Sequence, residues 1–321
     1  MKITAYIPAY NVAKYLGPTI ESLLNQTLPP QELLLIDDGS TDRTLQVAEA
    51  YTDPDAAKNP HQVPVRIIRH ERNKGLAAAR NTAFAHAQHE FVAAMDADAI
   101  ADPAWLEYLA PAFDDPEIAG AGGRLIETQR TGLGNAWRST YLLQDLGERP
   151  ITMQGNDNRR LGGFGTIFRK SVVQSIGGYD ESFRTNNEDV DLGTRLLAAG
   201  YKLHFEPRAI SLHQRTDTVK SALRMAWQWG FWEHYYNGGY NNIALKVLHN
   251  FRRARTLAWD DLRAHRTSFL YVDFLGAWYH SYLDLQYRYS SRRMPPVQAS
   301  PADSAKYYPR LIRTFMRPHK S

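Results

Sequence analysis

Cysteine is absent from the 321 residues of this sequence, and its absence excludes several kinds of chemistry. Disulfides, thiolate zinc sites, iron–sulfur clusters and cysteine nucleophiles all need the missing thiol. A thiol-free chain of this size fits a reducing compartment. The first ten residues, MKITAYIPAY, turn polar too early for a secretory signal.

Long apolar runs are missing as well. No window reaches the roughly 20 apolar residues that a membrane-spanning helix needs. The best candidate, residues 269–283, carries Asp273 and His280, which is typical of a buried or interfacial helix. We therefore expect a cytoplasmic protein that is soluble or attached peripherally to the inner face of the membrane.

Two short motifs are also missing. No G-x-G-x-x-G opens the first predicted helix, which disfavours a dinucleotide-dependent dehydrogenase. The histidines show no paired spacing such as His-x-x-x-His, so the sequence does not indicate a dedicated zinc site.

Acidic residues are scarce after residue 200. The whole chain has 38 Lys and Arg against 34 Asp and Glu, a net charge of +4. Residues 201–321 hold 19 against 8, or +11, which leaves 19 against 26, or −7, for the first 200 residues. Five of the seven tryptophans also lie after residue 200. Such a shift in composition indicates two regions with different roles.

Strand and helix signals alternate along the first 100 residues. The strands are expected at 2–8, 33–36, 66–68 and 91–95, and the helices between them at 12–27, 45–51 and 76–88. This alternation is typical of βαβ units, so it predicts an α/β fold with a mostly parallel central sheet flanked by helices.

The remaining chain predicts a second half of the same domain and a helical extension. Helices are expected at 102–113 and 188–199, and strands at 118–128, 162–168, 203–205 and 210–212. After residue 213 the pattern is helical and aromatic. We expect a catalytic domain over residues 1–213, with halves 1–100 and 101–213, and a C-terminal region over 214–321.

Polar loops follow the first two predicted strands. Tyr10 follows the first strand, and Asp38 lies in the Asp-Asp-Gly-Ser segment after the second. Ligands of parallel α/β sheets bind at the carboxyl ends of the strands, where an aromatic ring can cover a base and an aspartate can accept a hydrogen bond from it. The alternative is that residues 38–40 form only a turn with a helix cap.

The segment Asp96-Ala97-Asp98 follows the fourth predicted strand. Two carboxylates at a strand-to-loop turn suit a hard divalent cation such as Mg²⁺ or Mn²⁺, which fills its other positions with phosphate and water. The alternative is a solvated acidic turn.

Taken in order, these segments resemble one enzyme family. The series IPAYNVAKYLGPTIESLLNQT, LLLIDDGSTDRT, ERNKGLAAARN and FVAAMDADA, followed by GGFGTIFRKSVVQSIGGYDESFRTNNEDVDLG, resembles the inverting family 2 glycosyltransferases of the GT-A fold. The similarity covers about residues 1–215. It implies a Rossmann-like catalytic domain that uses a nucleotide-diphosphate sugar, most simply a UDP-linked one, with Mn²⁺ or Mg²⁺.

The resemblance implies a role for each matching residue. Donor binding falls to Pro8, Ala9, Tyr10, Asp38, Arg80, Asp96 and Ala97. Asp96 contacts the ribose or the metal, and Asp98 is the principal metal ligand. Arg80 could equally be a helix-surface residue. Gly162 and Gly163 would let the backbone approach the donor sugar, although glycines in a strand also mark bulges.

Two further positions are assigned in the acceptor-side half. Glu188-Asp189 matches the acidic pair of the family, in which the aspartate is the general base; by itself such a pair is also an ordinary helix-capping feature. His213 follows a short predicted strand, where some relatives carry a metal-binding histidine, and the alternative is a structural histidine.

The aromatic and basic C-terminal region has two interpretations. The cluster Trp227, Trp229, Phe231, Trp232, Tyr235 and Tyr236 is either the core of a helical subdomain or a platform for an acceptor or a membrane interface. The arginines that could meet anionic lipid or a lipid-linked diphosphate are Arg252, Arg253, Arg255, Arg292 and Arg293. Nucleic acid is not expected as a partner, because no matching motif is present.

The sequence therefore predicts a metal-dependent inverting glycosyltransferase, of the hexosyl- or N-acetylhexosaminyltransferase class, acting on a glycan or a lipid-linked saccharide. A sugar-1-phosphate nucleotidylyltransferase is the first alternative, but the first strand is not followed by a glycine-rich basic phosphate loop. The second is an inactive carbohydrate-binding scaffold, against which the intact acidic pairs argue.

Overall fold

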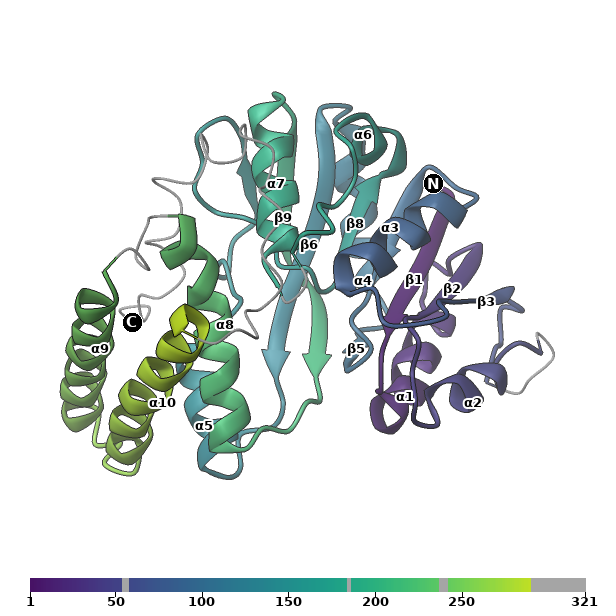
Figure 1. Cartoon of the computed structure of the whole chain (residues 1–321). Coiled ribbons are helices and arrows are strands. Elements are labelled where there is room, and N and C mark those ends of the chain that lie inside the picture. Colours follow the sequence, from purple (N-terminus) through teal and green to yellow (C-terminus); the bar gives the residue numbers. More distant parts are fainter. Residues whose placement is uncertain (54–57, 184–185, 237–241, 290–321) are drawn as a thin grey trace. The chain divides into compact units, whose positions relative to one another are not determined.

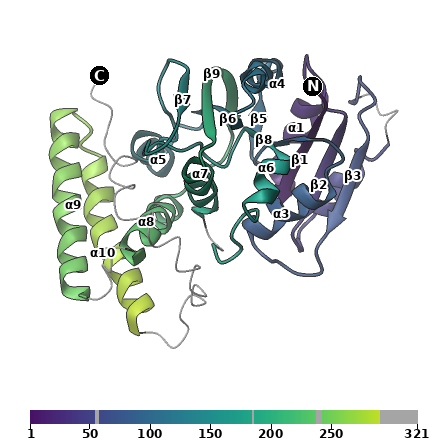
Figure 2. The same cartoon turned by 90° about the horizontal axis from the view of Figure 1, so that it is seen from above.

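The computed structural model describes residues 1–53, 58–183, 186–236 and 242–289 (Figures 1 and 2). The chain forms two compact units. The first, the α/β unit, contains residues Met1–Thr128 and Gln144–Arg215. The second, the helical unit, contains Gln129–Leu143 and the residues from Thr216 onward. The expected division at residue 213 thus differs at one segment, because Gln129–Leu143 is grouped with the C-terminal helices.

The α/β unit has a mixed sheet flanked by helices. Its strands are β1 (Ile3–Ala9), β2 (Glu32–Asp37), β3 (Val65–Arg69), β4 (Phe91–Ala94), β5 (Ala99–Ala101), β6 (Ile118–Glu127), β7 (Ile151–Met153), β8 (Thr166–Arg169) and β9 (Lys202–His213). Its helices are α1 (Ala13–Leu24), α2 (Thr44–Glu49), α3 (Leu76–His86), α4 (Trp105–Leu109), the 3₁₀ helix η1 (Ala110–Asp114), α6 (Lys170–Ser175) and α7 (Glu188–Ala198).

The strands form one sheet in the order β3-β2-β1-β4-β8-β6-β9-β5, and β7 pairs with β9. The four strands β3, β2, β1 and β4 are parallel, as the βαβ pattern predicts. The sheet beyond β4 is mixed, because β8 runs antiparallel to both β4 and β6, while β6 and β9 are parallel. The mostly parallel sheet expected from the sequence is therefore found only in the N-terminal half, β1 to β4.

Helices cover both faces of the sheet. Ile3, Ala5 and Ile7 of β1 point to the face packed against α1 and α4, whereas Tyr6 points to the face packed against α3 and α7. Every residue of β1 is buried, as in a central strand with layers on both sides. This layering leaves the carboxyl ends of β1, β2 and β4 as the edge where their polar loops gather.

Strand β9 replaces two short predicted strands. The sequence predicts strands at 203–205 and 210–212, and β9 runs unbroken over Lys202–His213. Its pairing with β6 shifts register between Gly122 and Arg124, where the partner passes from Phe205 to Ile210. Because of this register shift, β9 can include the polar segment around Pro207 and still end with His213 paired to Glu127.

The helical unit contains α5 (Leu133–Tyr141), α8 (Val219–Tyr236), α9 (Ile243–Arg263) and α10 (Phe269–Tyr289). Within it, α9 and α10 lie side by side as an antiparallel pair in both views (Figures 1 and 2). Helix α5 belongs to this unit because Arg138 is ion-paired to Asp217 at 3.0 Å, with both side chains 1% exposed. Trp137 also donates to Asp273 of α10 at 2.9 Å.

The structure separates the two interpretations of the aromatic cluster. Trp227 and Phe231 on α8 are 6% and 3% exposed, and their rings contact each other at a tilt, with centroids 5.3 Å apart. These two are core residues, so the platform interpretation is wrong for them. Trp229 is half-buried against the same core. Trp232, Tyr235 and Tyr236 have side chains outside the described set, and Arg292 and Arg293 lie outside the described residues.

One histidine in the helical unit makes the stability of the protein depend on pH. His280 is buried, and burial, together with the positive charges of Arg253 and Lys246, lowers its pKa to about 4, although its contact with the Leu223 carbonyl and the charge of Asp284 act in the opposite direction. The unfolded chain binds a proton near pH 6.5, whereas the folded protein resists it until about pH 4. Stability from this residue is therefore present above pH 6.5 and lost as the pH falls toward 4.

Replacing His280 by glutamine is expected to reduce that loss by roughly 3 kcal/mol, since each pKa unit of difference is worth about 1.4 kcal/mol. The free energy of unfolding in urea is measured for both proteins at pH 7.5 and pH 4. Between pH 7.5 and pH 4, the free energy of unfolding should fall less in the glutamine variant than in the unchanged protein. An equal fall in both proteins would contradict the prediction.

Candidate functional site

Two loops at the carboxyl ends of β1 and β2 are held together by Asn11. This residue has a left-handed backbone, with φ of 53°. Its side-chain carbonyl accepts from the Thr41 N–H at 2.8 Å, and its own N–H donates to Ser40 Oγ at 3.1 Å. Between these loops Pro8 and Ala9 are buried, whereas Tyr10 is 47% exposed. A free aromatic face beside a fixed loop is suited to stacking on a base.

Asp38 is buried beneath the loop that leads into α3. One carboxylate oxygen lies 2.7 Å from His70 Nδ1 and accepts from the Lys74 N–H at 2.8 Å. The other accepts from the Gly75 N–H at 2.9 Å. Asp38 therefore connects the end of β2 to the residues before α3. The alternative, in which residues 38–40 form only a turn with a helix cap, does not account for these contacts. The contact of Asp38 with a nucleoside stays a prediction.

His70 is a residue that the sequence reasoning missed. It follows β3 directly, and its Nε2 lies 2.9 Å from Thr82 Oγ1 on α3. Its position at the carboxyl end of a parallel strand is the signal that could have found it.

Arg80 lies at the centre of the site and is 1% exposed. Its guanidinium contacts Asp96 Oδ1 at 3.3 Å and Glu188 Oε1 at 3.3 Å. The third contact is the Tyr6 hydroxyl at 3.4 Å. The helix-surface alternative for Arg80 is therefore wrong, because this side chain joins α3 to the loop after β4 and to the start of α7.

Gly163 passes close to the same cluster. A Cβ at this position would meet Arg80 Nη2 at 2.6 Å and Asp189 Oδ2 at 3.3 Å. A side chain here would collide with the guanidinium. The backbone can therefore come this close to the site only because residue 163 is glycine. The segment is not a regular strand, because β8 begins later, at Thr166.

Glu188 and Asp189 begin α7 and differ in accessibility. Glu188 is 3% exposed and faces Arg80, whereas Asp189 is only half-buried. Burial raises the pKa of Glu188 to about 7, and the charge of Asp189 adds to this, while Arg80 opposes it. Burial also raises the pKa of Asp189, against the influence of Arg80 and of the Val190 and Gly163 N–H groups.

Because they differ in accessibility, the two carboxylates can take part in different chemistry. Asp189 accepts from the Val190 N–H at 2.8 Å, so part of its placement is the capping chemistry of the alternative interpretation. Its second oxygen points toward Gly163. Asp189 is thus the carboxylate of the pair that an acceptor hydroxyl can reach, and a raised pKa makes it a better proton acceptor.

Asp98 and His213 lie side by side. His213 Nε2 is 3.3 Å from Asp98 Oδ2, and its Nδ1 is 2.9 Å from Glu127 Oε1. The strands explain the arrangement, because His213 is the register partner of Ala99 in β5 and of Glu127 in β6. Burial alone would lower the pKa of His213, but the two carboxylates raise it to about 9. Hydrogen bonding and the charge of His213 hold the pKa of Asp98 below its usual value despite burial.

These residues fit a divalent cation in part. A carboxylate oxygen beside an imidazole nitrogen, with a second carboxylate behind the ring, is a common arrangement at metal sites. Glu127, which the sequence reasoning missed, supplies that second carboxylate. Asp96 instead faces Arg80, and within the described residues no three His, Asp or Glu side chains are arranged to hold a metal ion. The predicted set of Asp96, Asp98 and His213 is therefore not assembled around one point.

The fold resembles that of solved glycosyltransferases. The mannosyltransferase PcManGT from Pyrobaculum calidifontis, in complex with GDP-Man and Mn²⁺, superposes with a TM-score of 0.59 at 15% identity, over 88% of this chain and 87% of that one. Residues 1–349 of S. aureus TarS in complex with UDP-GlcNAc give 0.56 at 16% identity, over 90% and 92%. The α/β fold of the GT-A type expected from the motifs is confirmed.

Sequence comparison gives the family. The pre-mycofactocin glycosyltransferase of Mycobacterium tuberculosis is 28% identical over 220 residues, which are 68% of this chain but 44% of that protein. The chain thus spans less than half the length of this relative. The model of glycosyl transferase family 2 matches residues 4–177, and that of glycosyl transferase family group 2 matches residues 91–286. Since the first match alone covers more than half of the chain, the protein belongs to glycosyl transferase family 2.

Proposed function

We propose that this protein is a metal-dependent, inverting glycosyltransferase that works in the cytoplasm. It moves a hexosyl or N-acetylhexosaminyl group from a UDP-linked donor to a hydroxyl of a glycan or a lipid-linked saccharide. The observation that carries the proposal is the cluster at the carboxyl edge of the sheet, where Asp189, Arg80 and Asp96 come together from α7, α3 and the loop after β4. A complex of the similar TarS with UDP-GlcNAc supports the donor class.

The chain would hold the donor along the ends of β1, β2 and β4. Tyr10 would cover the base, while Pro8, Ala9 and Asp38 form the wall beside it, and Asp96 and Ala97 would lie next to the ribose. Asp98 and His213 would hold Mn²⁺ or Mg²⁺. The cation, when bound, supplies positive charge that stabilises the departing diphosphate.

The chemical step needs one proton acceptor on the acceptor side. Asp189 would take the proton of the attacking hydroxyl as that oxygen forms its bond to the anomeric carbon and the bond to the diphosphate breaks. A single displacement of this kind inverts the anomeric configuration. Arg80 would keep Asp96 and Glu188 in place on either side of the reacting groups. A general base typically contributes about 10²–10⁴-fold to the rate.

The donor assignment is tested by thermal shift with a panel of nucleoside diphosphates and nucleotide sugars in the presence of Mn²⁺. Ligand at 100 times its dissociation constant stabilises a protein by about 2.7 kcal/mol. Uridine nucleotides should raise the melting temperature, and adenosine and guanosine nucleotides should not. A selective response to guanosine nucleotides would overturn the UDP assignment while leaving the reaction class open to test.

Removal of divalent metal is expected to abolish transfer. EDTA should eliminate product formation, and Mn²⁺ or Mg²⁺ in excess should restore it, because without a cation the Asp98 carboxylate would repel the negatively charged diphosphate. The same treatment should abolish the thermal shift caused by UDP, which needs no turnover. The variant Asp98→Asn should lose the Mn²⁺-dependent part of that shift. Full transfer in excess chelator would show that the reaction needs no cation.

A further inference from the structure

Helix α10 buries most of its acidic and polar side chains and exposes most of its large apolar ones. A helix on a globular protein usually buries its apolar face and exposes its polar one. The buried face of α10 carries Asp273, His280, Ser281 and Asp284, together with Phe269, Val272 and small residues. Most of its aromatic and large aliphatic side chains beyond Val272 are exposed. The outward face is therefore the one that needs a partner.

The outward residues of α10 follow a helical period, and we name them the α10 stripe: Tyr271, Phe274, Leu275, Trp278, Tyr282 and Leu285. Trp278 is 68% exposed and Tyr271 is 64% exposed. Single exposed apolar residues are ordinary on protein surfaces, but a contiguous apolar stripe four turns long marks an interaction site.

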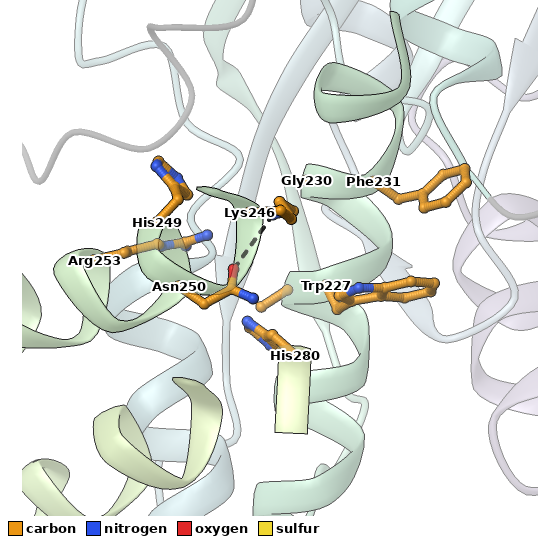
Figure 3. A pocket seen from close by; sticks show the side chains of 9 residues that line it. Trp227, Gly230, Phe231, Lys246, His249, Asn250, Arg253 and His280 are labelled. Carbon is orange, nitrogen blue, oxygen red and sulfur yellow. Dashed lines mark hydrogen bonds between the residues drawn. The ribbon is translucent and has the colours of Figure 1, made fainter. Parts of the chain in front are cut away.

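The buried polar side chains of α10 make contacts inside the helical unit. Asp284 accepts from Trp227 Nε1 at 2.7 Å and from Asn250 Nδ2 at 2.8 Å. Figure 3 shows Asn250 and His280 close to each other in the pocket that Trp227 also lines, and Lys246 is joined to Asn250 by a hydrogen bond of 3.3 Å. These hydrogen bonds hold α10 in its present rotation about the helix axis, with the α10 stripe outward.

Helix α9 extends the same surface. Its outward residues, the α9 stripe, are Leu245, Leu248, Arg252, Arg255, Trp259 and Leu262. Phe251 of α9 packs edge-on against Trp278 of α10, with ring centroids 5.1 Å apart. This contact joins the two stripes into one surface, which mixes aromatic side chains with arginines.

The charge of this surface has one sign. Among the described residues 242–289, the exposed charged side chains are Arg252, Arg255, Arg263 and Arg288. The acidic residues of the same segment are Asp260, Asp261, Asp273 and Asp284, and none of them is in the exposed class. A partner of opposite charge is thus favoured.

We propose that the α9 and α10 stripes together form a docking face for an anionic lipid bilayer. Aromatic side chains settle at the depth of the headgroups, and arginines reach the lipid phosphates from the same plane. A second copy of the chain fits less well, because an isologous contact would bring the arginines against one another without an exposed carboxylate to pair them. None of the described helices is long and apolar enough to cross a membrane, which leaves binding in the plane of the interface.

This inference goes beyond the proposed transfer reaction, and its test needs no turnover. The full chain is sedimented with vesicles of phosphatidylcholine, alone or mixed with phosphatidylglycerol, at low and high salt. Binding to the anionic vesicles should exceed binding to neutral ones by about 10-fold or more, and salt should weaken it.

A pair of charge-reversal variants locates the docking face. Arg252→Glu with Arg255→Glu should reduce binding to anionic vesicles by about 10-fold or more. The matched control reverses two exposed basic residues of α8, Lys220→Glu with Arg224→Glu, in the same unit. It should bind as the unchanged protein does. Equal losses in both variants would overturn the assignment to α9.

Tryptophan fluorescence tests the depth of insertion. Trp259 and Trp278 are exposed, whereas Trp105, Trp137 and Trp227 are buried. Vesicles with brominated acyl chains should quench the fluorescence of the bound protein. Trp259→Phe with Trp278→Phe should remove this quenching while the protein still sediments.

Two results would overturn the proposal. The first is the absence of sedimentation with anionic vesicles at low salt. The second is a dimer in light scattering without lipid that Trp278→Ser converts to a monomer, since the face would then be covered by a second copy.

Discussion

Replacement of Asp189 by asparagine is expected to lower the turnover number about 10²-fold or more, because the amide cannot accept the acceptor proton. Asparagine keeps the size of the side chain, and its carbonyl oxygen can still accept from the Val190 N–H, so α7, whose N-cap is Asn187, should still begin at the same place. The measurement is the initial rate of transfer at saturating donor, beside the thermal shift caused by UDP with Mn²⁺. The rate should fall while the shift persists.

Two companion variants make this result specific. Glu188→Gln changes the carboxylate that is buried against Arg80, and Glu49→Gln changes an exposed carboxylate on α2 that the site does not use. Glu49→Gln should leave the rate unchanged. Near wild-type turnover in Asp189→Asn would move the base elsewhere, and a much larger loss in Glu188→Gln would move it to Glu188.

The stereochemistry of the product is a separate readout of the same proposal. With Asp189 as base and no nucleophile of the protein bonded to the sugar, one displacement inverts the anomeric centre. An α-linked donor should therefore give a β-linked product in an NMR spectrum of the disaccharide. Retention would contradict the single displacement even if Asp189 were essential.

The parallel half of the fold could be predicted because its signals are local. β1 and β2 are short apolar runs separated by an amphipathic helix, and this alternation specifies βαβ units without knowledge of the rest of the chain. The directions of β6, β8 and β9 depend on which neighbours they meet across long connections. Nothing in their own residues encodes that choice, so the mixed half could not be predicted.

The candidate site was predictable as a set of residues but not as a set of contacts. Asp98 and His213 are 115 positions apart, and only the pairing of β5 with β9 brings them together. Glu127 reaches the same point through β6 and has no local motif. The burial of Arg80 was also hidden, because an alanine-rich helix gives no sign of which face is covered. These placements are tertiary effects.

Replacement of Arg80 by methionine is expected to cost about 3–5 kcal/mol of stability, the range for breaking a buried ion pair by removing one partner. The guanidinium is 1% exposed and contacts Asp96, Glu188 and the Tyr6 hydroxyl. Methionine fills much of the volume but leaves the Glu188 carboxylate, 3% exposed, without its counter-charge. The free energy of unfolding in urea, followed by circular dichroism, measures the loss.

The reason for this loss is electrostatic, and a second substitution tests that reason. Glu188→Gln in the Arg80→Met background removes the uncompensated charge, so it should recover a substantial part of the lost stability, whereas a loss of packing alone would not be recovered. The matched control is Lys58→Met, which breaks an ion pair to Glu21 whose side chains are 63% and 36% exposed. Exposed pairs contribute about 0–1 kcal/mol, so this variant should differ little from the unchanged protein. A double variant less stable than Arg80→Met would show that Glu188 is held by contacts other than the guanidinium, and that Arg80 acts mainly by filling space.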